Sequence, residues 1–109
     1  MHKAVISHLR TRAEPRVFYW HTPNGGKRGI IEASIFKSLG VVAGVPDLVF
    51  VHRGECFGLE LKADRGKLTP SQVLVHAAMQ EAGAKTAVAH SLDEALVTLE
   101  CWGLLKRAA

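Results

Sequence analysis

The stretch PDLVFVHRGECFGLELK, residues 46–62, most constrains what this chain can fold into. Two runs rich in β-branched, aromatic and aliphatic residues, Leu48 to Val51 and Cys56 to Ala63, flank the four residues HRGE. Such runs favour strands, and so short a connection favours an antiparallel hairpin. The stretch therefore predicts two paired, largely buried strands. Its two ends nevertheless carry three charged residues: Asp47, Glu60 and Lys62.

The rest of the chain predicts helices and further strands around this hairpin. Helical spacing of apolar residues indicates helices over residues 2–13, 30–40, 70–82 and 92–102, with Thr69 and Ser91 as N-caps and Gly40 as a C-cap. Residues 14–23 and 85–89 have the composition of extended segments. The order α-β-α-β-β-α-β-α predicts an α/β fold, in which a mixed, mainly four-stranded sheet is flanked by helices on both faces. The last strand follows a helical crossover and is expected to run parallel to the strand before it.

Length and composition bound the class of protein. With 109 residues and 48% hydrophobic content, we expect a single domain, residues 1–109, around one core. No apolar run approaches the roughly 20 residues that cross a bilayer, and the first residues lack a signal-peptide pattern. Cys56 and Cys101 are far apart in sequence, which favours two reduced thiols. These features predict a cytoplasmic protein with no membrane partner.

Charge is concentrated in the N-terminal part of the chain. The formal net charge is +4, and residues 1–40 hold seven lysines and arginines against two glutamates. A basic surface favours a polyanion, because phosphate neutralisation dominates affinity for nucleic acids. Ordinary solvated side chains explain the same excess equally well.

Strand geometry predicts that the charged residues of the hairpin lie close together. Side chains alternate between the two faces of a strand, so Gly58, Glu60 and Lys62 share one face, while the intervening apolar residues share the other. Gly58 is expected to leave open space beside Glu60. Pairing across the hairpin would bring the Asp47 carboxylate near Glu60. Two close carboxylates repel each other unless a cation lies between them, and a hard ion such as Mg²⁺ suits oxygen ligands.

This arrangement suits metal-assisted hydrolysis of phosphodiesters. A divalent ion held by Asp47 and Glu60 would polarise a phosphoryl group, and Lys62 would steady the attacking water or the developing negative charge. The competing interpretation is structural: Glu60 and Lys62 form an ion pair on a solvated face, and Asp47 caps a turn. Spacing alone does not separate the two.

Three segments together resemble a known family. HTPNGGKR, GVPDLVF and LELKADRGKLTPSQ are similar, in this order, to the VRR-NUC branch of the PD-(D/E)xK nuclease superfamily. The match runs from His21 to Gln72 and, more loosely, to WGLL near the C-terminus. The resemblance implies a restriction-endonuclease-like fold. It also implies functional residues: Asp47, Glu60 and the backbone carbonyl of Leu61 as metal ligands, Lys62 as the catalytic lysine, and Gln72 facing the site.

The chain departs from this family at one position. The family usually supplies a further Glu from the N-terminal helix, and its expected position falls at or before Met1. Neither Glu14 nor Glu32 matches that position. We therefore expect one well-defined metal ion per subunit, Mg²⁺ or Mn²⁺, with His2 as an open candidate for additional help.

Several residues around the central motif are candidates for contacts with nucleic acid. Glycines let backbone approach a ligand closely, and basic side chains reach phosphates. The candidates are His21, Asn24, Gly25, Gly26, Lys27, Arg28, Arg65 and Lys67. A plain loop and solvated charges are the alternative for each. His76 follows Gln72 by one helical turn and so shares its face.

The sequence therefore predicts a divalent-metal-dependent DNA endonuclease. Standalone members of the family imply a homodimer that cuts branched DNA such as four-way junctions, because two symmetric cuts need two sites. The alternative is a nucleic-acid-binding module of the same fold with weak or no catalysis. A third interpretation is a protein-interaction domain with an incidental ion pair.

Overall fold

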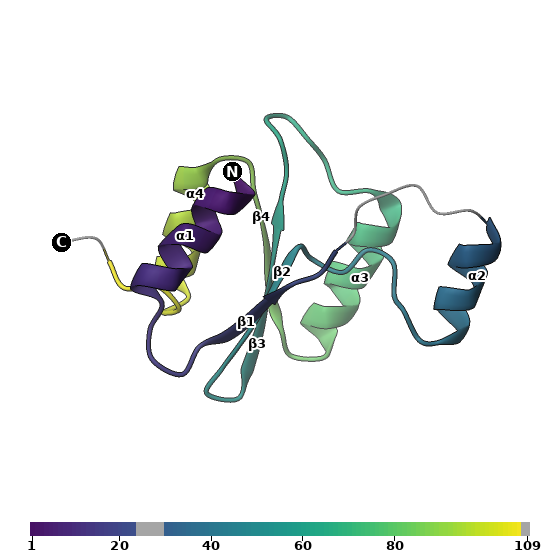
Figure 1. The fold of residues 1–109 in the computed structure, drawn as a ribbon, viewed down its shortest axis with the longest axis horizontal. Helices are drawn as coiled ribbons and strands as arrows, with labels where there is room; N and C mark the ends of the chain where they lie inside the picture. Colours follow the sequence, from purple (N-terminus) through teal and green to yellow (C-terminus); the bar gives the residue numbers. More distant parts are fainter. Residues whose placement is uncertain (24–29, 108–109) are drawn as a thin grey trace.

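The computed structural model describes residues 1–23 and 30–107. The elements follow the predicted order (Figure 1), with boundaries within a few residues of those expected. They are α1 (His2–Arg12), β1 (Phe18–His21), α2 (Ile30–Ser38), β2 (Leu48–His52), β3 (Glu55–Leu61), α3 (Pro70–Glu81), β4 (Lys85–Ala89) and α4 (Leu92–Cys101).

The four strands form one mixed sheet in the order β1-β2-β3-β4. The β1–β2 and β2–β3 pairs are antiparallel, whereas β3 and β4 are parallel, as the helical crossover between them predicts. The hairpin closes through Arg53 and Gly54, whose φ angles are 50° and 81°. Positive φ at both central residues is the geometry that lets a two-residue turn follow the twist of its strands. This tight turn fixes the register that brings Leu48 opposite Leu59.

Helices cover both faces of the sheet, as expected. In Figure 1, α1 and α4 lie on one side and α3 on the other. The side with α1 and α4 holds the core, because the alternating apolar side chains of β2 and β3 point to that side. Its fully buried residues include Val5, Leu9, Leu48, Phe50, Leu59 and Leu99. No helix within the described ranges is long and apolar enough to cross a membrane.

Helix α2 does not flank the sheet (Figure 1), although the predicted fold places the helices on its two faces. It lies beyond α3 and away from the sheet (Figure 1), and the side chains of Ile35 and Leu39 are exposed. The predicted end at Gly40 is confirmed, since Gly40 has a φ of 89° and the Val41 N–H donates to the Phe36 carbonyl. The helical spacing was correct, but spacing does not determine whether an apolar face meets a partner.

Candidate active site

Asp47 lies directly across the hairpin from Glu60. The β2–β3 register pairs Leu48 with Leu59, and one further step along each strand places Asp47 opposite Glu60. The Asp47 backbone N–H donates to Glu60 Oε1 at 3.2 Å, and the Leu61 N–H donates to Asp47 Oδ2 at 2.9 Å. The structure thus brings together the two carboxylates that strand pairing was expected to bring together.

Glu60 is a buried carboxyl group, with 3% of its surface exposed. Its Oε2 accepts a hydrogen bond from Gln72 Nε2 at 3.2 Å and lies 3.6 Å from Lys62 Nζ. Burial, followed by the negative charge of Asp47, raises the pKa of Glu60 to about 7, because the opposing effect of the Lys62 charge is smaller. The positive charge of Lys62 alone therefore does not compensate for two ionised carboxylates at this site.

Gln72 reaches Glu60 because the start of α3 fixes its side chain. Thr69 is the N-cap and Pro70 follows at the first helical position, as the sequence predicts. Thr69 Oγ1 accepts from the Gln72 N–H, and Gln72 Oε1 accepts from the Thr69 N–H at 2.9 Å. This capping box orients the amide. With its oxygen bonded to Thr69, the Gln72 amide directs its NH₂ group to Glu60.

The expectation of open space beside Glu60 was wrong. A Cβ added to Gly58 would lie 2.6 Å from Pro46 Cγ and 3.2 Å from Met79 Cε. Pro46, directly before Asp47, therefore packs onto the sheet in the space that a side chain at position 58 would need. Gly58 allows the approach of Pro46 to β3, and that packing holds the start of β2 against β3 beside the two carboxylates.

Two histidines adjoin Asp47 on the side of the sheet that carries α1. His21 Nδ1 lies 3.0 Å from the Asp47 carbonyl oxygen, which also accepts from the Thr22 N–H. The His2 ring stands edge-on to the His21 ring, with 4.4 Å between centroids. Burial and the neighbouring His21 lower the pKa of His2, while Asp47 acts in the opposite direction. The beginning of α1 thus lies beside the site. The sequence alone had left the position of His2 open.

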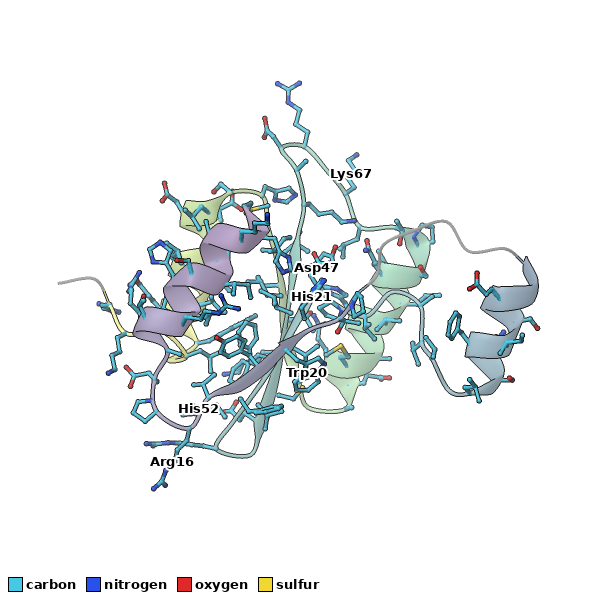
Figure 2. All side chains as sticks on the ribbon, in the orientation of Figure 1. Arg16, Trp20, His21, Asp47, His52 and Lys67 are labelled. Carbon is cyan, nitrogen blue, oxygen red and sulfur yellow. The ribbon has the colours of Figure 1, made fainter. Side chains whose placement is uncertain are left out.

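The two glutamates considered for the absent carboxylate lie elsewhere. Glu14 lines a pocket of about 520 Å³ between the α1–β1 connection and the hairpin turn, together with Arg16, His52 and Arg53. Figure 2 shows Arg16 and His52 at the opposite end of the molecule from Lys67, with Asp47 and His21 between them. Glu32 is exposed on α2. Neither stands beside Glu60.

Two of the candidate contacts with nucleic acid lie in one loop. Arg65 and Lys67 are exposed in the loop between β3 and α3, which His90 braces through a 2.7 Å contact from Nε2 to the Gly66 carbonyl. This loop leaves the sheet immediately after Lys62. The predicted candidates Asn24, Gly25, Gly26, Lys27 and Arg28 lie outside the described residues.

The donor set fits a hard divalent cation of the magnesium type. Such ions bind through one or two carboxylates and keep several waters, so Asp47 and Glu60 suffice for them. The raised pKa of Glu60 fits the same conclusion, since a cation would relieve the repulsion between the carboxylates. Within residues 1–23 and 30–107, no group of three or more His, Cys, Asp or Glu side chains is placed to hold one metal ion. The set therefore suits a largely hydrated ion and not a closed structural site.

Sequence reasoning did not identify the burial of His76. It placed His76 on the face of Gln72, but the structure adds that only 5% of His76 is exposed and that its Nε2 has no hydrogen-bond partner among the described residues. Helical spacing could have indicated the burial of His76, because the residue shares the inward-facing side of α3 with Gln72, Val75 and Met79.

Comparison with known proteins gives a structural match alone. No family model and no curated protein matches the chain. A solved structure described as a VRR_NUC domain protein superimposes with a TM-score of 0.72 and 23% sequence identity, over 91% of this chain and 81% of that one. The chain therefore has the VRR-NUC fold.

Proposed function

We propose that this protein is a divalent-metal-dependent endonuclease that hydrolyses phosphodiester bonds in DNA. The observation that carries the proposal is the convergence of Asp47, Glu60 and Lys62 at one end of the hairpin, with Lys62 Nζ 3.6 Å from Glu60 Oε2. The VRR-NUC fold supports it. A purely structural ion pair would not require a second carboxylate opposite Glu60, where it raises the pKa of the first.

In this proposal Asp47 and Glu60 hold the cation, together with the backbone carbonyl of Leu61. When bound, Mg²⁺ or Mn²⁺ would polarise the scissile phosphate and favour deprotonation of the attacking water. Water forms a new P–O bond as the ester P–O bond breaks, and negative charge grows on the phosphate oxygens. The Lys62 ammonium stabilises that charge from its position beside Glu60. Gln72 keeps Glu60 in place through its 3.2 Å hydrogen bond.

The basic loops would position the DNA backbone around these residues. Arg65 and Lys67 extend from the loop that follows Lys62, and His21 stands beside Asp47. Contacts of this kind fix the position of the duplex and carry no sequence information. We assign the same role to Asn24, Gly25, Gly26, Lys27 and Arg28 from the sequence.

The experiment that tests the proposal is cleavage of supercoiled plasmid in Mg²⁺ or Mn²⁺, with an EDTA control. Lys62→Ala is compared with Lys85→Ala, which removes a lysine paired with Glu55 at the same 3.6 Å but with exposed side chains. We expect cleavage by the wild type and Lys85→Ala, and loss of cleavage in Lys62→Ala and in EDTA. Equal cleavage by both variants would overturn the role of Lys62.

We further propose that the protein acts as a homodimer on four-way junctions. Phe18, Trp20 and Val51 form an exposed apolar patch on the edge strand β1 and its neighbour β2, on the face away from α1. Such patches are typical of protein interfaces. Sedimentation analysis should give a dimer that Trp20→Glu dissociates, and junctions should be cut faster than linear duplex. A strict monomer would contradict the dimer, and equal rates would contradict the junction preference.

A second candidate is a nucleic-acid-binding module of the same fold without efficient catalysis. Its support is the small number of metal ligands: within the described ranges, no three acidic, histidine or cysteine side chains are placed around one ion. This candidate predicts DNA binding that weakens with salt, no cleavage in Mg²⁺ or Mn²⁺, and no change in melting temperature when either ion is added.

A further inference from the structure

His76 is a buried polar side chain with a ring nitrogen left unpaired in the described part of the chain. It lies on α3 with 5% of its surface exposed, and its Nε2 has no partner among the described residues. Leaving a buried donor or acceptor unpaired is unfavourable, so native structures rarely tolerate it without a reason. An apolar residue at this position would avoid that cost.

Two flanking contacts fix the position of His76. Four residues before it, Gln72 donates to Glu60; three residues after it, Met79 Cε lies 3.2 Å from where a Cβ of Gly58 would be. Helix α3 therefore runs over the face of β3 that carries Gly58, Glu60 and Lys62. His76 faces the same surface from the inner stripe of the helix, between those two contacts.

The charge of Lys62 acts on His76. Burial lowers the pKa of His76, and the positive charge of Lys62 lowers it further. Both causes favour the neutral imidazole, which carries one ring nitrogen with a free lone pair. An imidazole in that form can accept a hydrogen bond from an ammonium group.

The Lys62 ammonium has more N–H donors than its ion pair with Glu60 uses. Its Nζ carries three N–H groups, and the ion pair that the structure gives it, with Glu60 Oε2, is at 3.6 Å, longer than a hydrogen bond. The same oxygen also accepts from Gln72. If a cation takes up the charge of Glu60, the attraction that holds Lys62 is weakened, and a neutral acceptor nearby becomes the group that can keep the ammonium in place.

We propose that His76 is a positioning residue for Lys62: its Nε2 accepts a hydrogen bond from the Lys62 ammonium once the charge of Glu60 is neutralised. The catalytic meaning of this contact rests on the proposed nuclease function, whereas the contact itself does not. In that state α3 holds both functional side chains of β3, Glu60 through Gln72 and Lys62 through His76.

Activity and stability together separate this role from simple packing. His76→Leu removes the buried polar atom, so we expect an unchanged or higher melting temperature. If His76 positions Lys62, the same variant loses kcat by about 10- to 100-fold, as for other groups that orient a reacting residue, with KM for DNA within about twofold. His76→Gln, which keeps an acceptor, recovers most of kcat. Met79→Leu, one turn along the same stripe, is the matched control and retains kcat.

A second measurement needs neither cleavage nor metal. In protein with ¹⁵N-labelled histidine in EDTA, at an alkaline pH where wild-type Glu60 is ionised because its pKa is about 7, Glu60→Gln removes the carboxylate charge and frees Lys62. We expect the His76 Nε2 resonance to move towards the position of a hydrogen-bonded acceptor in Glu60→Gln, and to stay at its wild-type position in the double variant Glu60→Gln with Lys62→Met.

The outcomes distinguish the two proposals. An unmoved Nε2 resonance in Glu60→Gln, or folded His76→Leu with the wild-type kcat, overturns the role of His76. Absence of metal-dependent cleavage by the wild type overturns the nuclease proposal, and the resonance then still decides whether Lys62 and His76 form the contact.

Discussion

Asp47 and Glu60 lie opposite each other, one residue beyond the Leu48–Leu59 pair of β2 and β3. The Asp47 N–H donates to Glu60 Oε1 at 3.2 Å. The backbone of one acidic residue thus fixes the carboxyl group of the other. Because Leu61 in turn donates to Asp47 Oδ2, the two carboxyl groups are held by main-chain atoms of both strands. This arrangement gives a preorganised pair of oxygen donors at a strand end.

Asp47→Asn should abolish cleavage and weaken binding of Ca²⁺, a non-reactive substitute for Mg²⁺. The change keeps the size of the side chain and an oxygen that can accept from Leu61, but it removes the negative charge that attracts a cation. Isothermal titration with Ca²⁺ and single-turnover plasmid cleavage measure the two effects. Asp93→Asn, an exposed aspartate on α4, is the control and should change neither.

The metal-free protein should lose stability through Glu60 as the pH rises from about 4.5 to about 7. The folded-state pKa of Glu60 is raised from 4.5 to about 7, so the folded protein binds more protons than the unfolded chain within this window. The full effect is about 3 kcal/mol. The lowered pKa values of His2 and His76 act in the opposite sense below pH 6.5, and these histidines are present in both proteins to be compared.

Urea unfolding of the wild type and Glu60→Gln in EDTA, across pH 4.5–7, isolates the contribution of Glu60. The advantage of the wild type over Glu60→Gln should shrink as the pH rises. Added Mg²⁺ should offset part of the loss near pH 7 in the wild type alone. A constant difference between the two proteins across this range would refute the raised pKa.

Gln72→Ala should reduce both stability and activity. It removes the side-chain half of the capping box at the start of α3, which costs about 1 kcal/mol, and it removes the donor to Glu60 Oε2. Gln80→Ala removes a hydrogen bond to Thr86 near the other end of the same helix and serves as the control. Only Gln72→Ala should lower kcat; an equal loss in both variants would mean that helix stability, and not the contact with Glu60, is responsible.

Arg53→Asn should raise the unfolding free energy by about 0.5–1 kcal/mol, because Asn adopts the left-handed conformation more readily than Arg. Arg53 has a φ of 50° in the hairpin turn. Gly54→Ala, at a φ of 81°, should lower stability by a similar amount. Chemical denaturation measures both changes, and a destabilised Arg53→Asn would indicate that the Arg53 side chain contributes to the fold.

The sequence predicted those parts of the fold that depend on local rules. Strand parity placed Glu60 and Lys62 on one face, and the short turn implied the pairing that brings Asp47 to Glu60. The capping signal at Thr69 predicted where α3 begins, and this start in turn places Gln72. Each of these inferences uses residues close together in sequence or joined by a tight turn.

The remaining features depend on packing between distant segments. The spacing of apolar residues in α2 predicted a helix but not its position beyond α3 (Figure 1). Gly58 appeared in the sequence as empty space, whereas Pro46 and Met79 fill it. The approach of His2 to His21 depends on how α1 packs against α4 and the sheet. No local pattern encodes these contacts.

A crystal structure of the protein soaked in Mn²⁺, with data collected at the manganese absorption edge, tests directly whether Asp47 and Glu60 hold the metal. We predict one anomalous peak within coordinating distance of both Asp47 and Glu60, and its loss in crystals of Asp47→Asn. A peak elsewhere on the chain, or no peak at a Mn²⁺ concentration that supports cleavage, would contradict the proposal that these two carboxylates hold the metal.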